Sequence, residues 1–424
     1  MKTFRFFPIL LILSLVLVAC GDDDDRTPPE VVDNQAPTAP ANLTVSNVTD
    51  TSLQLTWEAA DDNIGVSGYK VIQDGSELPE VATGTSITVT DLSPGTTYEF
   101  YLTAFDAAGN ISSSSNTVTQ ETAIRLEFRS NLSEMGVFTA TLASLAPAAG
   151  VQLYEINSTL FTDYAKKQRL IRMPEGQAMR YDNNDLLPVF PDNTLIAKTF
   201  YYNRNEQIPS EGRKIIETRI FLKINGVWEV GNYIWNEAQT EATYSEAGNN
   251  VPVSYIDGAG NTQDVNYQIP SKQDCFTCHN NNGSTFPIGM KLRSMNFTPS
   301  YTNKNQLQFL ADIGLLAGVN PSEVSVLPDW TDDVNYTLLE RGRAYLDVNC
   351  AHCHQPGGSV PSGFTIDFRY ETPFDDTNIY SNRGEIEARF QSTAPVYRMP
   401  QLGRTVVHQE ALQMLRDYLE AIEE

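Results

Sequence analysis

The pattern C-x-x-C-H occurs twice in this chain, at Cys275–His279 and at Cys350–His354. The two copies use four of the five cysteines and two of the four histidines. Two thiols three residues apart lie on one side of a helical turn, where they can form thioethers with two vinyl groups of one porphyrin. The histidine that follows is carried under the iron as its proximal ligand. We therefore predict two haem c groups, with attachment thiols and axial imidazoles at Cys275, Cys278, His279, Cys350, Cys353 and His354.

Zinc sites and disulfides are the alternatives to haem at these motifs. Zinc ribbons usually separate their C-x-x-C pairs by about 15 to 20 residues and need no histidine directly after each pair. Here the pairs are much farther apart, and a histidine follows both of them. The spacing favours haem, and zinc or disulfide chemistry stays open at both motifs.

The N-terminus has the layout of an export signal. Lys2 and Arg5 precede an apolar run from Phe6 to Ala19, which is too short to span a bilayer. The residues Leu17–Gly21 resemble the lipobox of bacterial lipoproteins, which implies cleavage before Cys20 and lipidation of that cysteine. We expect a signal peptide over 1–19, an acidic and proline-rich tether over 20–35, and a lipid-anchored extracytoplasmic protein, with the outer membrane or cell surface favoured.

The segment 36–122 has the alternating, β-rich pattern of a sandwich. Leu92–Tyr98, followed by alternating apolar residues, looks like a tyrosine corner. Together with Trp57 and Tyr69, this segment resembles a fibronectin type III domain of the kind attached to bacterial extracellular carbohydrate-active enzymes. The resemblance implies that Trp57, Tyr69 and Tyr98 are core residues, and that the domain is a spacer or contacts carbohydrate or the cell surface.

Residues 123–270 form a second β-rich domain, in which Asn225-Gly226 between two apolar runs predicts a hairpin. This segment contains no histidine and no cysteine, which excludes a histidine-ligated copper or iron centre and a Ser-His or Cys-His nucleophile there. The carboxylates Glu217, Glu229 and Glu237 could supply a glycosidase acid and base. On ordinary strands, however, we interpret them as solvent-facing charges. The aromatic side chains Trp228, Tyr233 and Trp235 are expected in the core.

The region 271–424 is predicted to be mostly α-helical, with a helix over 335–348 that leads into Cys350 and a closing helix over 409–422. This arrangement resembles class I cytochrome c. The resemblance implies that Met399, which precedes a proline, is the distal ligand of the second haem, and that Gly342 contacts Tyr418 where the helices cross. The alternative is that Met399 is buried apolar filler. His408 is expected to cap the last helix or face solvent, and we expect no ligand role for His352.

The first motif follows an extended segment and lacks a clear sixth ligand. Met290 or Met295 could be the distal ligand, and we select Met290. Alternatively, the iron is left open or takes a group from the β-rich domain. A helix over 305–316 is expected to link the motifs.

Stretches such as Leu160–Lys167 and Tyr233–Ala242, with both haem motifs, resemble an uncharacterised family of exported bacterial proteins over about residues 150–420. The leading hypothesis is a dihaem cytochrome that exchanges electrons with a redox protein or a small donor or acceptor, and an electron carrier is favoured over a catalyst. The alternatives are a peroxidase-like oxidoreductase using the first haem, and a surface binding or scaffold protein. The formal charge of −24 argues against nucleic acid as a partner.

Overall fold

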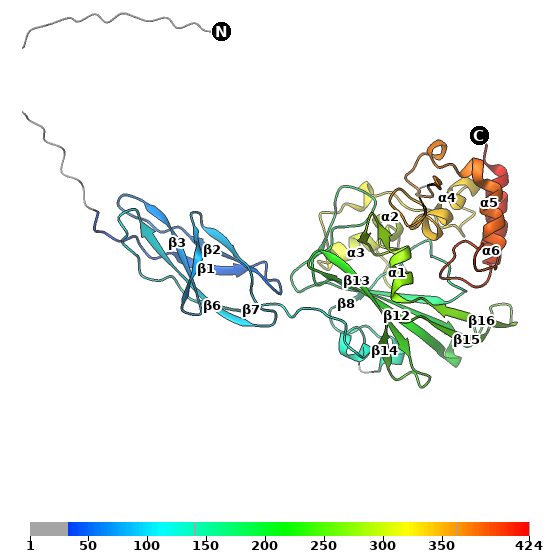
Figure 1. Ribbon diagram of the computed structural model, residues 1–424, viewed down its shortest axis with the longest axis horizontal. Helices are drawn as coiled ribbons and strands as arrows, with labels where there is room; N and C mark the ends of the chain where they lie inside the picture. The colour runs from blue at the N-terminus through cyan, green and yellow to red at the C-terminus, as the bar shows by residue number, and fades with distance from the viewer. Residues whose placement is uncertain (1–32, 140, 362, 424) are drawn as a thin grey trace, which may run out of the picture. The chain divides into compact units, whose positions relative to one another are not determined.

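The computed structural model describes residues 33–139, 141–361 and 363–423 (Figure 1). The expected signal peptide and Cys20 lie outside these residues. Within them, no helix is both long and apolar enough to cross a membrane. The chain divides into two compact units with a boundary between residues 124 and 125.

The first unit is a β-sandwich. One sheet has the strand order β1-β2-β5 and the other β4-β3-β6-β7. The strands are β1 (Ala41–Ser46), β2 (Leu53–Glu58), β3 (Val66–Gln73), β4 (Ser76–Ala82), β5 (Ser86–Val89), β6 (Thr97–Asp106) and β7 (Val118–Glu121). Alternate side chains of each sheet point inward, as the period of two requires.

The tyrosine corner of this sandwich is confirmed. The backbone N–H of Ser93 donates to Tyr98 Oη at 2.8 Å, which ties the start of β6 to the preceding loop. Trp57 and Tyr69 are buried and meet edge to face, with ring centroids 5.3 Å apart. Tyr98 is only partly buried, because its hydroxyl lies at the edge of the core.

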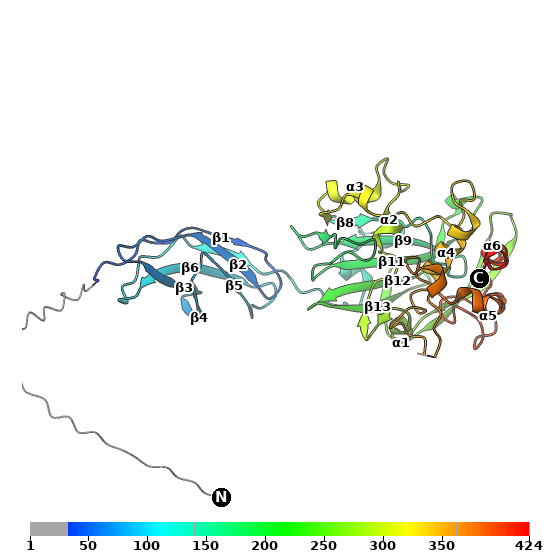
Figure 2. The ribbon, with the colours of Figure 1, turned by 90° about the horizontal axis from the view of Figure 1, so that it is seen from above.

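The second unit is built on an antiparallel sheet in the order β14-β13-β12-β11-β9-β8, and Figure 2 shows several of these strands side by side. Its strands are β8 (Val151–Leu153), β9 (Lys166–Arg172), β11 (Leu195–Asn203), β12 (Arg213–Ile224), β13 (Val227–Trp235) and β14 (Ala242–Ser245). The predicted hairpin at Asn225-Gly226 is confirmed, with both residues at positive φ, 50° and 78°. Such a turn matches the twist of the strands that it joins.

The two faces of this sheet bury different segments of the chain. On one face, Leu170, Leu195 and Leu222 pack with residues from the start of the unit. On the other face, Ile196 and Phe221 share a core with apolar residues that follow the first motif. The sheet and the motif region therefore form one compact unit, and the expected domain boundary at residue 270 falls inside it.

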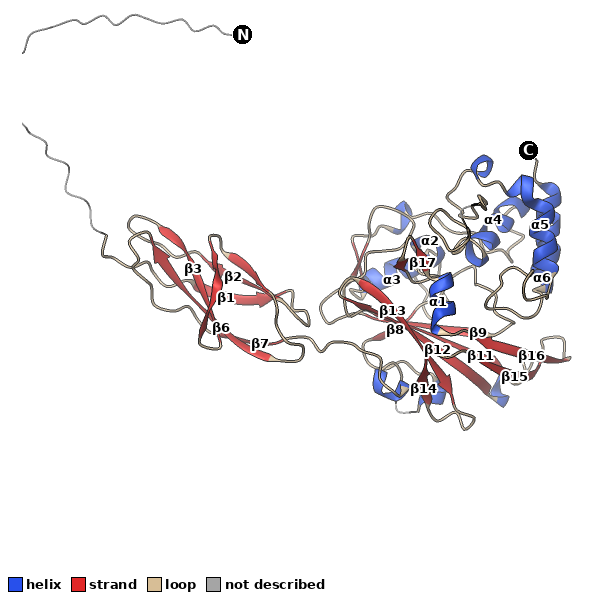
Figure 3. Ribbon diagram, viewed as in Figure 1, coloured by secondary structure: helices blue, strands red, loops and turns tan. Residues whose placement is uncertain are grey.

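The helices come late in the chain and gather on one side of the sheet (Figure 3). They are α1 (Lys272–Cys278), α2 (Leu292–Met295), α3 (Gln306–Asp312), α4 (Leu338–Asn349), α5 (Ile379–Gln391) and α6 (Gln409–Ala421). The remaining strands are the short β10 (Met179–Arg180), β17 (Asn280–Asn281), β18 (Ser284–Thr285) and β19 (Leu316–Ala317), and the hairpin pair β15 (Asn249–Ile256) and β16 (Thr262–Ile269). The helices expected near 305–316, 335–348 and 409–422 are present as α3, α4 and α6, and α3 is shorter than expected because Gly314 adopts a positive φ of 77°.

The predicted contact between Gly342 of α4 and Tyr418 of α6 is confirmed. A Cβ built on Gly342 would overlap the Tyr418 ring atoms Cγ and Cδ2 and lie 2.9 Å from its Cβ. Tyr418 has no exposed surface. Only glycine at position 342 therefore allows the two helices to approach this closely.

The interpretation of Glu217 as a solvent-facing charge is wrong, because this side chain is fully buried. It accepts hydrogen bonds from Arg219, at 2.5 and 3.0 Å, and from Tyr267 Oη, at 2.7 Å. Glu229 and Glu237 are exposed, as expected. Trp228, Tyr233 and Trp235 lie in the core, as predicted.

Candidate functional site

The first C-x-x-C-H motif lies on α1, which begins directly after β16. Ser271 caps this helix by accepting from the backbone N–H of Asp274, whose carboxylate accepts in return from the N–H of Ser271. The reciprocal capping box allows a helix of seven residues to form after an extended segment. Cys275 and Cys278 lie one turn apart on this helix, and His279 ends it.

The imidazole of His279 is held in one orientation by a hydrogen bond to the backbone. Its Nδ1 lies 2.9 Å from the carbonyl oxygen of Phe286. A carbonyl can only accept, so Nδ1 carries the proton and Nε2 keeps its lone pair. The ring also packs against Phe221, with centroids 4.6 Å apart. Burial lowers the pKa of His279 to about 3, so the ring is neutral at pH 7.

The second motif follows α4. Thr337 and Glu340 form the capping box that starts this helix, and Cys350 ends it. The backbone N–H of His354 donates to the carbonyl of Cys350 at 3.0 Å, which continues the helical turn through the motif. The His354 ring lies 5.1 Å from the Phe368 ring. Among the described residues, its buried Nδ1 has no hydrogen-bond partner, and burial lowers the pKa of this imidazole.

Met399 lies in a loop that Arg404 holds closed. The guanidinium of Arg404 is almost fully buried and donates to the carbonyl of Met399, at 2.8 and 3.1 Å. It also donates to the carbonyls of Phe390 and Ser392, at 2.8 and 3.0 Å. Met399 itself is partly buried. Arg404 has no signature in the sequence, because a single arginine in a loop forms no pattern.

Met290, the residue selected as the distal ligand of the first haem, lies 1% exposed in the apolar cluster that also contains Cys275 and Met295. The structure thus brings both candidate methionines into the core beside the first motif.

His408 is the N-cap residue of α6, but its side chain neither caps the helix nor faces solvent as expected. The residue precedes α6, but its side chain makes no capping hydrogen bond. The ring is buried and stacks on Phe161, with centroids 4.1 Å apart and planes 10° apart. Its Nδ1 lies 3.0 Å from Tyr345 Oη. The His408 ring therefore lies in an aromatic pocket formed by segments that are far apart in the sequence.

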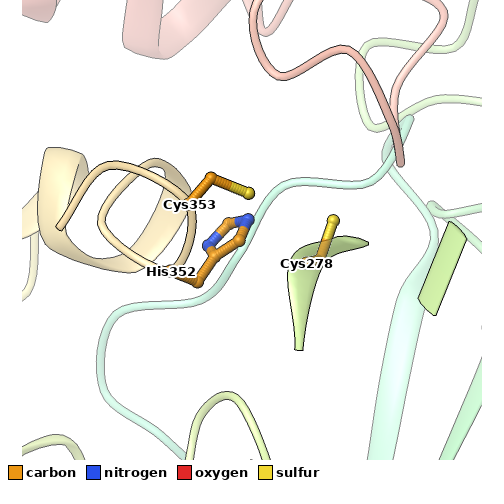
Figure 4. Close-up of side chains that lie close together, drawn as sticks. All are labelled: Cys278, His352 and Cys353. Atoms are coloured by element: carbon orange, nitrogen blue, oxygen red, sulfur yellow. The ribbon is translucent and has the colours of Figure 1, made fainter. Parts of the chain in front are cut away.

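The two motifs lie against each other. Cys278 Sγ, Cys353 Sγ and one ring nitrogen of His352 all lie within 4.8 Å of one another (Figure 4). Cys278 is the last residue of α1 and Cys353 lies in the turn after α4, and His352 points into the space between the two sulfurs' segments (Figure 4). Thiolate and imidazole groups are common zinc ligands. If haem is attached at the cysteines instead, the same side chains would lie beside the edge of the porphyrin. The position of His352 in its motif gave no sign of this arrangement.

A cavity of about 630 Å³ lies beside the second motif and the loop that follows the first motif. It is lined by Lys198 from the sheet, by Phe286 from the loop that holds His279, and by Ala351 and His352 from the second motif. Its volume is in the range of small-molecule sites.

Positive charges gather on the sheet beside this cavity. Arg169, Lys198 and Arg219 are direct neighbours across strands β9, β11 and β12. Burial and the two adjacent arginines lower the pKa of Lys198. Within the described residues, one terminal nitrogen of the buried Arg169 has no hydrogen-bond partner. Of these three side chains, only Lys198 is among the residues that line the cavity, and Arg219 is paired with Glu217.

The donor set fits covalently attached haem. The cysteines Cys275, Cys278, Cys350 and Cys353 are free thiols, and each pair is followed by an imidazole that is neutral at pH 7. In addition, Cys275 lies in an apolar environment, and Lys198 lines the cavity beside the second motif. The same thiols also leave the zinc alternative open at Cys278, His352 and Cys353.

Comparisons with known proteins concern a minor part of the chain. A family model described as "Fibronectin type III domain" matches residues 38–121. The chain is 47% identical over 91 residues to chitinase A1 of Niallia circulans, covering 22% of this chain and 13% of the chitinase. It is 40% identical over 100 residues to exoglucanase B of Cellulomonas fimi, covering 24% of this chain and 9% of that enzyme. The chain thus spans less than a fifth of these relatives.

Similar solved structures are also matched over a limited share of the chain. FN3tt is 26% identical with a TM-score of 0.19, and the match covers 21% of this chain and 97% of that one. The Yersinia enterocolitica family 28 exopolygalacturonase is 22% identical with a TM-score of 0.19, and the match covers 21% of each chain. The family model and the observed sandwich agree that residues 38–121 form a fibronectin type III domain.

Proposed function

We propose that this protein is a dihaem c-type cytochrome that transfers electrons outside the cytoplasm. The observation that carries the proposal is the state of His279, whose Nδ1 proton bonds to a carbonyl and whose Nε2 is free to ligate iron beside a pair of free thiols. His354 follows the second pair in the same way. Haem iron bound at these positions would take up and release single electrons.

The cysteines would hold the prosthetic groups covalently. Each thiol adds across one vinyl double bond, so that the sulfur bonds to one vinyl carbon and the hydrogen goes to the other. This addition needs no oxidant. Cys275 and Cys278 would take one porphyrin, and Cys350 and Cys353 the other. Because both pairs come at the ends of short capped helices, the thiols of each pair project from adjacent turns.

The second site supports a likeness to class I cytochrome c. The close crossing of α4 and α6 at Gly342 and Tyr418 is the contact that this resemblance implied. Met399 lies in a loop that Arg404 fixes through the carbonyl of Met399 itself. We propose that Met399 is the distal ligand there, and that Met290 is the distal ligand at the first site.

We further propose that Cys20 carries a lipid that anchors the protein to the cell envelope, with the outer membrane or cell surface favoured. The fibronectin type III domain would then hold the redox unit away from the anchor. Its likeness to parts of chitinases and an exoglucanase also supports contact with carbohydrate. The redox partner would be a protein or a small donor or acceptor, and the negative charge disfavours nucleic acid.

The test is the haem content of the full chain made in a haem-maturing host. A pyridine haemochrome assay should give two haems per chain, and mass spectrometry should find one on each cysteine pair. The variant Cys350→Ala/Cys353→Ala should keep one haem, on the first pair. Folded protein that contains zinc and no haem would refute the proposal and favour a metal site at Cys278, His352 and Cys353.

A second candidate function is peroxidase-like chemistry at the first haem. The cavity favours it, because His352 lines this space and, within the described residues, its buried Nδ1 has no hydrogen-bond partner. An imidazole in that position could move a proton. A high-spin haem on Cys275 and Cys278 that reacts with peroxide, and reacts more slowly in His352→Gln, would support this function. Two low-spin haems that do not react with peroxide would exclude it.

A further inference from the structure

The two C-x-x-C-H motifs meet at their second cysteines. Cys278 Sγ and Cys353 Sγ lie within 4.8 Å of each other, although 75 residues separate them in the chain. Cys353 Sγ also lies 3.9 Å from the carbonyl oxygen of Thr277, the residue before Cys278. The contact thus includes the backbone of one motif and the thiol of the other.

The loops that follow the two motifs are also bonded to each other. The backbone N–H of Asn282 donates to the carbonyl of Gly357 at 2.8 Å, and the side-chain amide of Asn281 donates to the carbonyl of Pro356 at 3.0 Å. A Cβ on Gly357 would overlap the amide group of the exposed Asn282 side chain, which would have to move. These bonds define how closely the two motifs approach.

Buried ion pairs hold the same two segments from the other side. Asp347, three residues before Cys350, is 6% exposed and accepts from Lys291 at 2.7 Å and from Arg293 at 3.0 Å. Both cations follow the first motif in the chain, and Arg293 is itself 2% exposed. Separating the motifs would leave buried charges unpaired, which costs about 3–5 kcal/mol for a buried pair. The junction is therefore a fixed part of the fold.

We propose that Cys278 and Cys353 bring the edges of the two porphyrins together, so that the two haems form one coupled pair. This inference rests on the proposed function. Each sulfur would bond to a carbon derived from a vinyl group, and that carbon is attached directly to the macrocycle, so neighbouring sulfurs at Cys278 and Cys353 would hold one edge of each porphyrin near the other. Two independent haem sites would not need contact between their attachment cysteines or hydrogen bonds between their following loops.

The assay is circular dichroism in the Soret region on the full chain with both haems bound. Two chromophores in contact give a couplet with lobes of opposite sign, whereas isolated haems give bands that add. We expect the spectrum to differ from the sum of the spectra of Cys275→Ala/Cys278→Ala and Cys350→Ala/Cys353→Ala. In the unmodified protein, reducing one haem of the pair should collapse the couplet, because the two Soret bands then no longer coincide.

A matched pair of glycine variants tests the geometry. Gly357→Asn keeps a residue that tolerates the positive φ of 78°, but its Cβ overlaps Asn282, so we expect a weaker couplet at unchanged haem content. Gly283→Asn changes a glycine in the neighbouring loop with a φ of 80°, where a Cβ meets nothing within 4 Å. This control should leave the couplet unchanged.

The outcomes separate this inference from the function on which it rests. The protein could bind two haems and still give a spectrum equal to the sum of the two single-haem spectra, both when oxidised and when half-reduced. That result would overturn the coupled pair and leave the dihaem cytochrome intact. Fewer than two haems per chain would overturn both. Zinc bound with the stoichiometry of the Cys278, His352 and Cys353 cluster would also overturn both.

Discussion

Replacement of Gly342 by alanine tests the packing of the helices around the second motif. Alanine favours an isolated helix by about 1 kcal/mol over glycine. Here, however, the added Cβ would overlap two ring atoms of Tyr418, which is fully buried and cannot rotate away. Overpacking of this kind costs about 1–3 kcal/mol, and the severity of the overlap places the cost near 3. The expected net loss is about 2 kcal/mol.

Scanning calorimetry of the full chain measures this loss, because the fibronectin domain and the unit over 125–424 are separate compact units. For a unit as large as Arg125–Glu424, about 2 kcal/mol corresponds to a decrease in Tm of roughly 3 °C. The matched control is Gly384→Ala in α5, where a Cβ meets nothing within 4 Å. That substitution should raise stability by up to about 1 kcal/mol.

A double-mutant cycle identifies the contact responsible. In the background of Tyr418→Gly both the ring and the Cβ at position 418 are absent, so Gly342→Ala should become stabilising by about 1 kcal/mol. The change of sign corresponds to a coupling energy of about 3 kcal/mol. If Gly342→Ala were neutral or stabilising in the unmodified protein, the argued packing of α4 on α6 would be wrong.

Four further predictions concern other parts of the chain. Tyr98→Phe removes the acceptor of the tyrosine corner and should destabilise only the fibronectin domain, by about 1 kcal/mol, as seen in its calorimetric transition. Glu217→Ala leaves a buried arginine unpaired and should cost about 3–5 kcal/mol in denaturant unfolding of the second unit. Burial lowers the pKa of His408 to about 4 in the folded protein, so as the pH falls the unfolded chain takes up a proton on this histidine before the folded protein does. Protonation of His408 should therefore lower the free energy of unfolding by about 3 kcal/mol between pH 6.5 and pH 4. The variant His408→Phe should lack this loss in its stability–pH curve. Arg404→Lys keeps the positive charge but cannot donate to several carbonyls at once as the planar guanidinium does, so the loop that carries Met399 should loosen. The methionine-to-iron charge-transfer band should then weaken as in Met399→Ala, while the haem content stays unchanged.

Controls for these predictions come from the same elements. The exposed Glu229→Ala should change stability by less than about 0.5 kcal/mol, in contrast to Glu217→Ala. A flat difference between the stability–pH curves of the unmodified protein and His408→Phe would show that His408 does not titrate as argued. An unchanged charge-transfer band in Arg404→Lys would show that this arginine does not position Met399.

Local patterns were sufficient for much of the fold. The Asn225-Gly226 hairpin, the tyrosine corner at Tyr98 and the helix before Cys350 all rest on neighbouring residues, and each is present. The contact of Gly342 with Tyr418 was also predicted, because it came with a resemblance that specifies long-range packing. The buried state of Glu217 was missed, since its partner Tyr267 is 50 residues away in the chain.

The donor groups of the two motifs follow from the sequence, because C-x-x-C-H places two thiols and an imidazole within one helical turn. How the two motifs lie relative to each other depends on tertiary contacts instead. The meeting of Cys278 with Cys353, and the entry of His352 into the same space, depend on helices that pack from distant parts of the chain. Side-chain spacing within a helix is a local property, whereas the distance between two helices is set by the ion pairs, loops and core residues of the whole unit.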